Sequence, residues 1–258
     1  MLRVLIAGLI LIFGPAGVFA ADKPSSANLA RFFETVVFGS EEKDLIKGST
    51  VIKKWDGAIR ITVSALAGKI IPKADGGREM KLSKRQPTAI EVKLIRKHLK
   101  SLFKITGLKA ESAKKTGKKP NLFIKFVPHK TMMSPIHVPG VNPKILRRLG
   151  RAGTCYFLSA DKRGRIVWAT IVVNNQMSER EMDACLMEEM TQTLGLPNDS
   201  DLVKPSMFNN RAQPTAINRT DQILIRTLYD KRLTPGMPRG DAMKLAARLI
   251  AAWNKKLP

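Results

Sequence analysis

Residues 178–199 read SEREMDACLMEEMTQTLGLPND, and they decide the predicted fold. Ser178 and Glu181 have the spacing of a capping box, in which two side chains satisfy backbone N–H groups at the start of a helix. Gly195 and then Pro197 stop that helix. Between them, a buried helical face is indicated by apolar residues that recur every three to four positions: Met182, Leu186, Met190 and Leu194. We therefore expect a helix over residues 178–195.

The same helix carries the densest cluster of polar functional groups in the sequence. Glu188 and Gln192 are four residues apart, so they share one helix face, one turn apart. Glu189 stands beside them, and the glycine turn lets Asn198 or Asp199 come back toward that face. These five side chains are the candidate site.

The spacing of these residues resembles that of the zincin metallopeptidases. In zincins, H-E-x-x-H places two zinc-binding histidines on one helix face with the glutamate as general base, and the metzincin form adds a glycine turn and a third ligand. Residues 188–198 here read E-E-x-x-Q-x-x-G-x-x-N. The strand expected over 165–174 corresponds to the substrate-binding edge strand of zincins, and Met207 lies in a segment similar to their methionine turn.

Residues 188–199 also resemble the hallmark, E-E-x-x-Q-x-L-G-L-x-N-D, of a family of uncharacterised exported bacterial proteins that are distantly similar to zincins. The resemblance covers most of the chain. It implies a zincin-like fold, with Glu189 in the position of the general base and a substrate- or metal-like cleft formed by Glu188, Gln192, Asn198 and Asp199. Gly195 would have a structural role. The family brings no assigned activity.

The ligand positions decide which chemistry the site could perform. Glu188 and Gln192 replace the two histidines, and Asn198 holds the third position. Zinc prefers His, Cys and carboxylate ligands, whereas oxygen ligands suit a hard divalent ion, so no cofactor is assigned and a hard divalent metal stays open.

Three hypotheses of function remain. The first is a non-catalytic or atypical zincin relative that binds a peptide or an envelope polymer. The second is a peptidase-like hydrolase that uses Glu189 as general base, with a non-His metal centre or none. The third is a basic protein that binds a membrane surface or another polyanion.

The N-terminus has the pattern of a signal peptide. Arg3 precedes an apolar run over residues 5–13, and Val18 and Ala20 are the small residues of a cleavage site. We expect cleavage after Ala20, which leaves residues 21–258 as one domain in the periplasm or the medium. No later segment is long and apolar enough to span a membrane.

The predicted export bears on the oxidation state of the two cysteines. In an oxidising compartment Cys155 and Cys185 would most simply form a disulfide, with two buried free thiols as the alternative.

The composition is strongly basic, with 45 Lys and Arg against 21 Asp and Glu and a net charge of +24. Such a charge attracts polyanions. Outside the cytoplasm these are anionic lipids and envelope polymers, and the sequence lacks zinc-finger spacing and aromatic RNA-binding motifs, so no nucleic-acid partner is expected. The oligomeric state is left open.

The whole pattern predicts an α/β (α+β) fold in a single zincin-like domain. We expect a small mixed sheet with an edge strand before the central site helix, and a helical C-terminal part. Residues 68–85 and 109–119 are expected to be exposed loops. The expected elements, in chain order, are a capped helix that follows Ser25-Ser26 and carries the apolar residues of 29–37, a strand at 59–63, a helix at 87–103, a strand at 121–127, a hairpin at 154–174, the helix at 178–195, and helices at 220–229 and 241–253.

Overall fold

The computed structural model describes residues 23–40, 44, 46–209 and 214–258, so the predicted signal peptide, residues 1–20, lies outside the described residues. The described residues form an α/β domain, which confirms the predicted class. The strands are β1 (Ile61–Pro72), β2 (Arg78–Arg85), β3 (Leu122–Val127), β4 (Cys155–Lys162) and β5 (Arg165–Asn174). The helices are α1 (Ser26–Phe38), α2 (Ala89–Thr106), α3 (Ala113–Thr116), α4 (Pro143–Leu149), α5 (Glu179–Gln192), α6 (Arg219–Leu228) and α7 (Arg239–Lys256), with short 3-10 turns η1 (His129–Thr131), η2 (Pro135–His137) and η3 (Gly150–Ala152).

The five strands form one mixed sheet in the order β2-β1-β3-β5-β4. The three inner strands run parallel, and β2 and β4 pair antiparallel at the two edges. In one detail the prediction differs: β5, expected at the edge, lies inside the sheet, and its hairpin partner β4 takes the edge. The continuous burial of residues 169–174 reflects this inner position, because parallel strands are covered on both faces.

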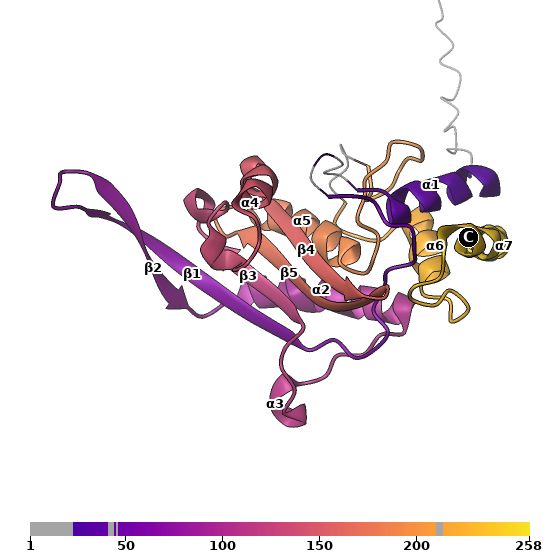
Figure 1. Ribbon diagram of the computed structural model, residues 1–258, viewed down its shortest axis with the longest axis horizontal. Coiled ribbons are helices and arrows are strands. Elements are labelled where there is room, and N and C mark those ends of the chain that lie inside the picture. The colour runs from indigo at the N-terminus through magenta and orange to yellow at the C-terminus, as the bar shows by residue number, and fades with distance from the viewer. Residues whose placement is uncertain (1–22, 41–43, 45, 210–213) are drawn as a thin grey trace, which may run out of the picture.

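Helices cover one face of the sheet, and a shorter segment covers the other. The main core packs α1, α2, α5, α6 and α7 against the sheet, and Figure 1 shows α1, α6 and α7 gathered at one end. On the opposite face, residues 128–152, here named the cap segment, contribute Met132, Val138 and Leu146 to a second cluster. Within the described residues, no helix is long and apolar enough to cross a membrane.

The strands β1 and β2 form a hairpin that projects from the body at the end of the sheet away from α7 (Figure 1). Residues 68–85 were expected to be an exposed loop, and that expectation is wrong, whereas the strand expected at 59–63 is confirmed in part as the start of β1. The lysines of the hairpin hid the strand pattern, because an edge hairpin in solvent tolerates charged side chains that a central strand would not. Asp75 closes the turn by accepting a hydrogen bond from the Gly77 N–H at 2.9 Å.

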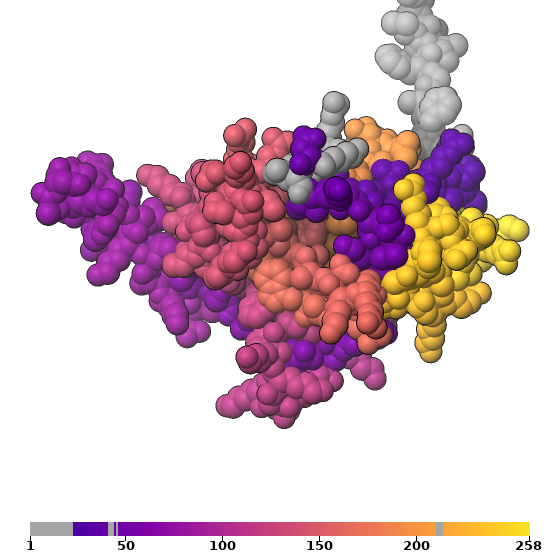
Figure 2. Space-filling view, in the orientation of Figure 1, coloured from indigo at the N-terminus to yellow at the C-terminus, as the bar shows by residue number. Residues whose placement is uncertain are grey.

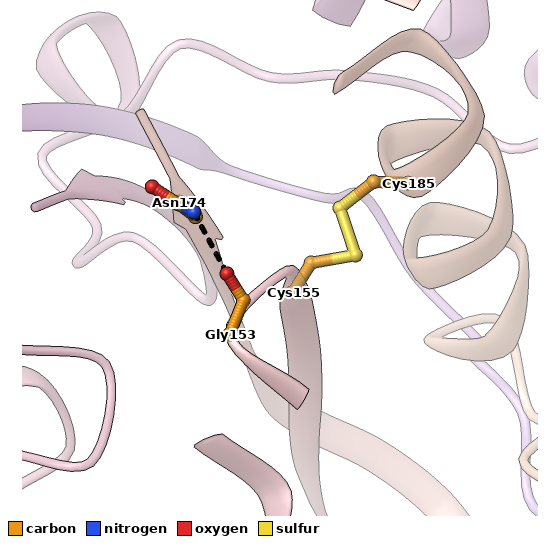
Figure 3. The surroundings of a disulfide bond; sticks show 4 residues. All are labelled: Gly153, Cys155, Asn174 and Cys185. Carbon is orange, nitrogen blue, oxygen red and sulfur yellow. Dashed lines mark hydrogen bonds between the residues drawn. A yellow bond between two sulfur atoms is a disulfide. The ribbon is translucent and has the colours of Figure 1, made fainter. Parts of the chain in front are cut away.

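The predicted disulfide between Cys155 and Cys185 is present, with the two Cα atoms 6.2 Å apart. It ties the first residue of β4 to the middle of α5 (Figure 3). Nearby, the Asn174 side chain donates to the Gly153 carbonyl at 2.7 Å and so fixes the chain just before β4 (Figure 3). The edge strand and the site helix are therefore held in one position relative to each other.

Candidate functional site

The helix α5 begins as the sequence predicts. The Glu181 N–H donates to the Ser178 hydroxyl at 3.4 Å, and the Ser178 N–H donates to the Glu181 carboxylate at 2.9 Å. These two bonds complete the capping box. The predicted apolar face is buried, with Leu186 fully enclosed. The helix is therefore fixed at its start and along its length, which leaves its C-terminal end to present the polar cluster.

The glycine turn that follows α5 requires a residue without a side chain. Gly195 has a φ of 105°, a backbone conformation that L residues rarely adopt. A Cβ atom at this position would lie 1.9 Å from the carbonyl oxygen of Lys53. The close approach of residues 53–54 therefore explains the glycine, and the turn directs the chain back toward α5.

The turn brings Asp199 to the helix face that carries Glu188 and Gln192. The Gln192 amide nitrogen donates to the Asp199 carboxylate at 3.2 Å. Burial, with a further contribution from the negative charge of Asp199, raises the pKa of Glu188 to about 8. Both causes disfavour the charged form of Glu188.

The side chain of Asn198 donates to backbone carbonyls and not to another side chain of the cluster. Its side-chain nitrogen donates to the Thr35 carbonyl at 3.1 Å and to the Asp199 carbonyl at 2.8 Å. Its backbone N–H donates to the Val36 carbonyl at 3.2 Å. Asn198 thus fastens the turn to the end of α1, and its amide hydrogens are taken up by the protein's own backbone.

Glu189, the candidate general base, is buried with 6% of its surface exposed. Successive residues of an α-helix point about 100° apart, so Glu189 and Glu188 lie on different sides of α5. Of the five predicted site residues, the structure brings Glu188, Gln192 and Asp199 together, whereas Glu189 and Asn198 take adjoining positions.

The segment that resembles a methionine turn is anchored by a buried carboxylate. Met207 is 1% exposed, and its N–H donates to Asp221 at 3.2 Å. The Ser206 hydroxyl donates to the same carboxylate at 2.6 Å, and Asp221 also completes the capping box of α6 with Asn218. Burial raises the pKa of Asp221 to about 6. The sequence singled out Met207 but did not assign this anchoring to Asp221.

A zinc ion, which the zincin resemblance implies, does not fit these side chains. Across the part of the chain that the structure describes, no three His, Cys, Asp or Glu side chains are grouped so that they could hold a metal. The cluster instead offers a pair of carboxyl groups and a side-chain amide, and amides are poor zinc ligands. Two of the three histidines make contacts elsewhere: His98 contacts Asp183 at 2.7 Å, and His137 contacts Thr131 at 3.0 Å.

A cavity of about 140 Å³ lies beside the glycine turn. One wall is the edge strand β4, through Phe157, Leu158 and Ser159. The rest of the lining comes from Pro197, from Leu149 of α4 and from six residues before β1: Gly39, Ser40, Ile46, Lys47, Ser49 and Lys53. On its other side β4 pairs with β5, so the cavity lies along an edge of the sheet with which no described strand pairs.

A second and larger cavity, of about 640 Å³, was not anticipated from the sequence. The buried Lys54 lines it and donates to the carbonyls of Leu228 at 2.8 Å and Asp230 at 3.2 Å. Burial lowers the pKa of Lys54 to about 8. These bonds hold the C-terminal end of α6, which is the ordinary use of a lysine at such a place.

Residues 26–247 match the model of a family described as "Protein of unknown function (DUF2927)". No curated protein and no solved structure matches the chain.

Proposed function

The chain belongs to the DUF2927 family, and we propose that it is an exported, zincin-like protein that binds an extended peptide or an envelope polymer without cleaving it. The disulfide supports the export, because such bonds persist in oxidising compartments. Two features of the described residues support the rest of the proposal. One is the hydrogen bonding within the candidate site, and the other is the edge strand β4 with its adjoining cavity.

The observation that carries the proposal is the internal bonding of the positions that correspond to metal ligands. Gln192 donates to Asp199, and Asn198 donates to two backbone carbonyls, one of them in α1. These hydrogen bonds stabilise the glycine turn. If the same side chains moved to bind an ion, the bonds would break, and each broken buried hydrogen bond would cost about 1–3 kcal/mol. The site therefore favours a structural use of these residues over metal-dependent hydrolysis.

The cavity beside β4 supports binding. An extended peptide can add to a free sheet edge through backbone hydrogen bonds, while pockets beside the edge select its side chains. Here the edge strand β4 and an adjoining cavity, partly lined by Phe157 and Leu158, provide both elements. An apolar side chain of the peptide would enter that cavity.

Fluorescence anisotropy with a labelled, unfolded polypeptide tests the proposal. We expect saturable binding with no cleavage products in mass spectrometry. Ser159→Trp places a large side chain at the wall of the cavity and should abolish binding. The matched control is Ser101→Trp, on the exposed surface of α2, which should bind normally. Stoichiometric metal in the purified protein, together with cleavage that Glu189→Gln abolishes, would refute the proposal.

One observation favours a hydrolase as the second candidate. The Glu188–Asp199 pair resembles, in its electrostatics, carboxyl pairs that share a proton and work as general acid and base. In this alternative the protonated Glu188 supplies a proton to the leaving group, and the neighbouring Asp199 carboxylate activates water. Glu188→Gln would then remove the alkaline limb of the pH–rate profile near the pKa of about 8, whereas absence of turnover across peptide and cell-wall substrates would exclude it.

A further inference from the structure

One stretch of the chain contains many basic residues and no acidic residue. Residues 112–160 contain ten lysines and arginines and no aspartate or glutamate. The cap segment lies within this stretch, and its exposed residues include Lys130, Lys144, Arg147 and Arg151. Among the described residues, none of these four takes part in an ion pair of 4 Å or less. The cap segment therefore presents a positive surface to its surroundings.

The same segment exposes large apolar side chains. Met133 is 47% exposed and Ile136 is 63% exposed. A Cβ atom added to Gly150 would lie 2.9 Å from Met133, so this methionine lies next to the turn that follows α4 and its arginines. Exposed apolar groups surrounded by basic groups are typical of a surface that meets a partner.

The projecting hairpin continues this surface. A Cβ atom added to Gly68 would lie 3.0 Å from Pro128, so the even-numbered face of β1 turns toward the cap segment. That face carries Ile70, which is 49% exposed and pairs with Met80. Figure 2 shows the hairpin and the cap segment next to one another on one side of the molecule.

A cavity of about 440 Å³ joins the two parts of this surface. Its lining includes Leu66 and Lys84 from the hairpin, Lys125 from β3 and Ile136 from the cap segment. The cavity between the hairpin and the body is thus lined by both apolar side chains and lysines. We name the cap segment, the even-numbered face of the hairpin and this cavity together the basic–apolar face.

We propose that the basic–apolar face is the docking surface for an anionic lipid bilayer. Met133, Ile136 and Ile70 enter the boundary between head groups and acyl chains, and the surrounding lysines and arginines bind the anionic head groups. Such binding combines buried apolar area with attraction to anionic lipid. None of Met133, Ile136 and Ile70 lines the cavity beside β4.

The apolar residues favour a lipid surface over a soluble polyanion. A carboxylate or phosphate polymer would bind the lysines and arginines but would bring no apolar phase for Ile136 and Met133. A bilayer brings both, and each basic residue near an anionic membrane contributes about fivefold in affinity.

Co-sedimentation with vesicles tests the proposal. The purified protein should bind vesicles of phosphatidylcholine and phosphatidylglycerol at low salt and should not bind pure phosphatidylcholine. Lys144→Glu with Arg147→Glu should weaken binding at least about 25-fold. Met133→Ser with Ile136→Ser should weaken it about tenfold with the charge unchanged.

Matched controls lie on α2, which packs on the opposite face of the sheet. Lys100→Glu with Lys104→Glu makes the same change in net charge, and Ile90→Ser removes a side chain that is 43% exposed. Both controls should bind vesicles within about threefold of the unchanged protein. Circular dichroism of every variant confirms that the fold is retained.

Three results would overturn the proposal. The first is equal binding to neutral and anionic vesicles. The second is an equal loss of binding in the α2 controls, which would indicate net charge alone. The third is binding to polyphosphate that matches vesicle binding in strength and is insensitive to Met133→Ser with Ile136→Ser, which would assign the face to a soluble polymer.

Discussion

Reduction of the disulfide should destabilise the whole domain. Cys155 and Cys185 join the edge strand to the site helix across a sequence separation of 30 residues. When the bond is intact, the unfolded chain contains a closed loop of that size and has fewer conformations to gain. Reduction therefore lowers the free energy of the unfolded state more than that of the folded state.

The loop length sets the magnitude. For a closed loop of 30 residues the lost chain entropy is about 12 cal/mol/K, which corresponds to about 3.6 kcal/mol at 25 °C. A domain of this size loses about 2–4 °C in Tm for each kcal/mol. We therefore expect reduction to lower the Tm by roughly 10 °C.

Thermal unfolding followed by circular dichroism measures this difference on one preparation, with and without reductant. The matched control is the double variant Cys155→Ala with Cys185→Ala, whose Tm should not respond to reductant. A reduced protein that melts within about 2 °C of the oxidised protein would refute the reasoning, because it would mean that the cross-link does not restrict the unfolded chain.

Three further predictions concern the site and its supports. Since the folded pKa of Glu188 lies above its unfolded value, its protonation stabilises the fold at low pH, and that stability is lost as the pH rises toward 8. Urea unfolding should show a loss of up to about 1.4 kcal/mol per pH unit between pH 5 and 8 that Glu188→Gln removes; an unchanged slope in the variant would contradict this. Gly195→Ala should cost more than about 2 kcal/mol because its Cβ meets the Lys53 carbonyl, whereas Gly107→Ala, also at positive φ but in open space, should cost about 1 kcal/mol; equal losses in denaturant unfolding would show that the contact relaxes. Asp221→Ala leaves the Ser206 hydroxyl and a backbone N–H without their acceptor and should cost about 3 kcal/mol, measured by urea midpoint; a cost below about 1 kcal/mol would mean that water replaces the carboxylate.

Local signals made much of the architecture predictable. The capping residues Ser178 and Glu181 and the apolar spacing placed α5 almost correctly, because helix starts depend on a few adjacent residues. Its predicted end was three residues too late, since residues 193–195 form a tight turn instead of helix.

The β1–β2 hairpin was not predicted as a whole, because its sequence carries weak local signals. Only the first part of β1, up to Ala65, pairs with β3, and the rest of the hairpin is mostly exposed, so its sequence lacks the pattern of a strand with one buried face. The position of β5 inside the sheet was likewise not visible, because strand order depends on contacts between distant segments.

By itself, the sequence determined the site helix, its glycine turn, the α/β class and the cysteine pair, because neighbouring residues carry those signals. Only the tertiary structure decided that Asn198 is bonded to α1, that burial and the neighbouring Asp199 raise the pKa of Glu188, and that β4 is the edge strand beside a cavity. Burial and charge–charge interactions depend on residues far apart in the chain, and the fold alone sets those distances.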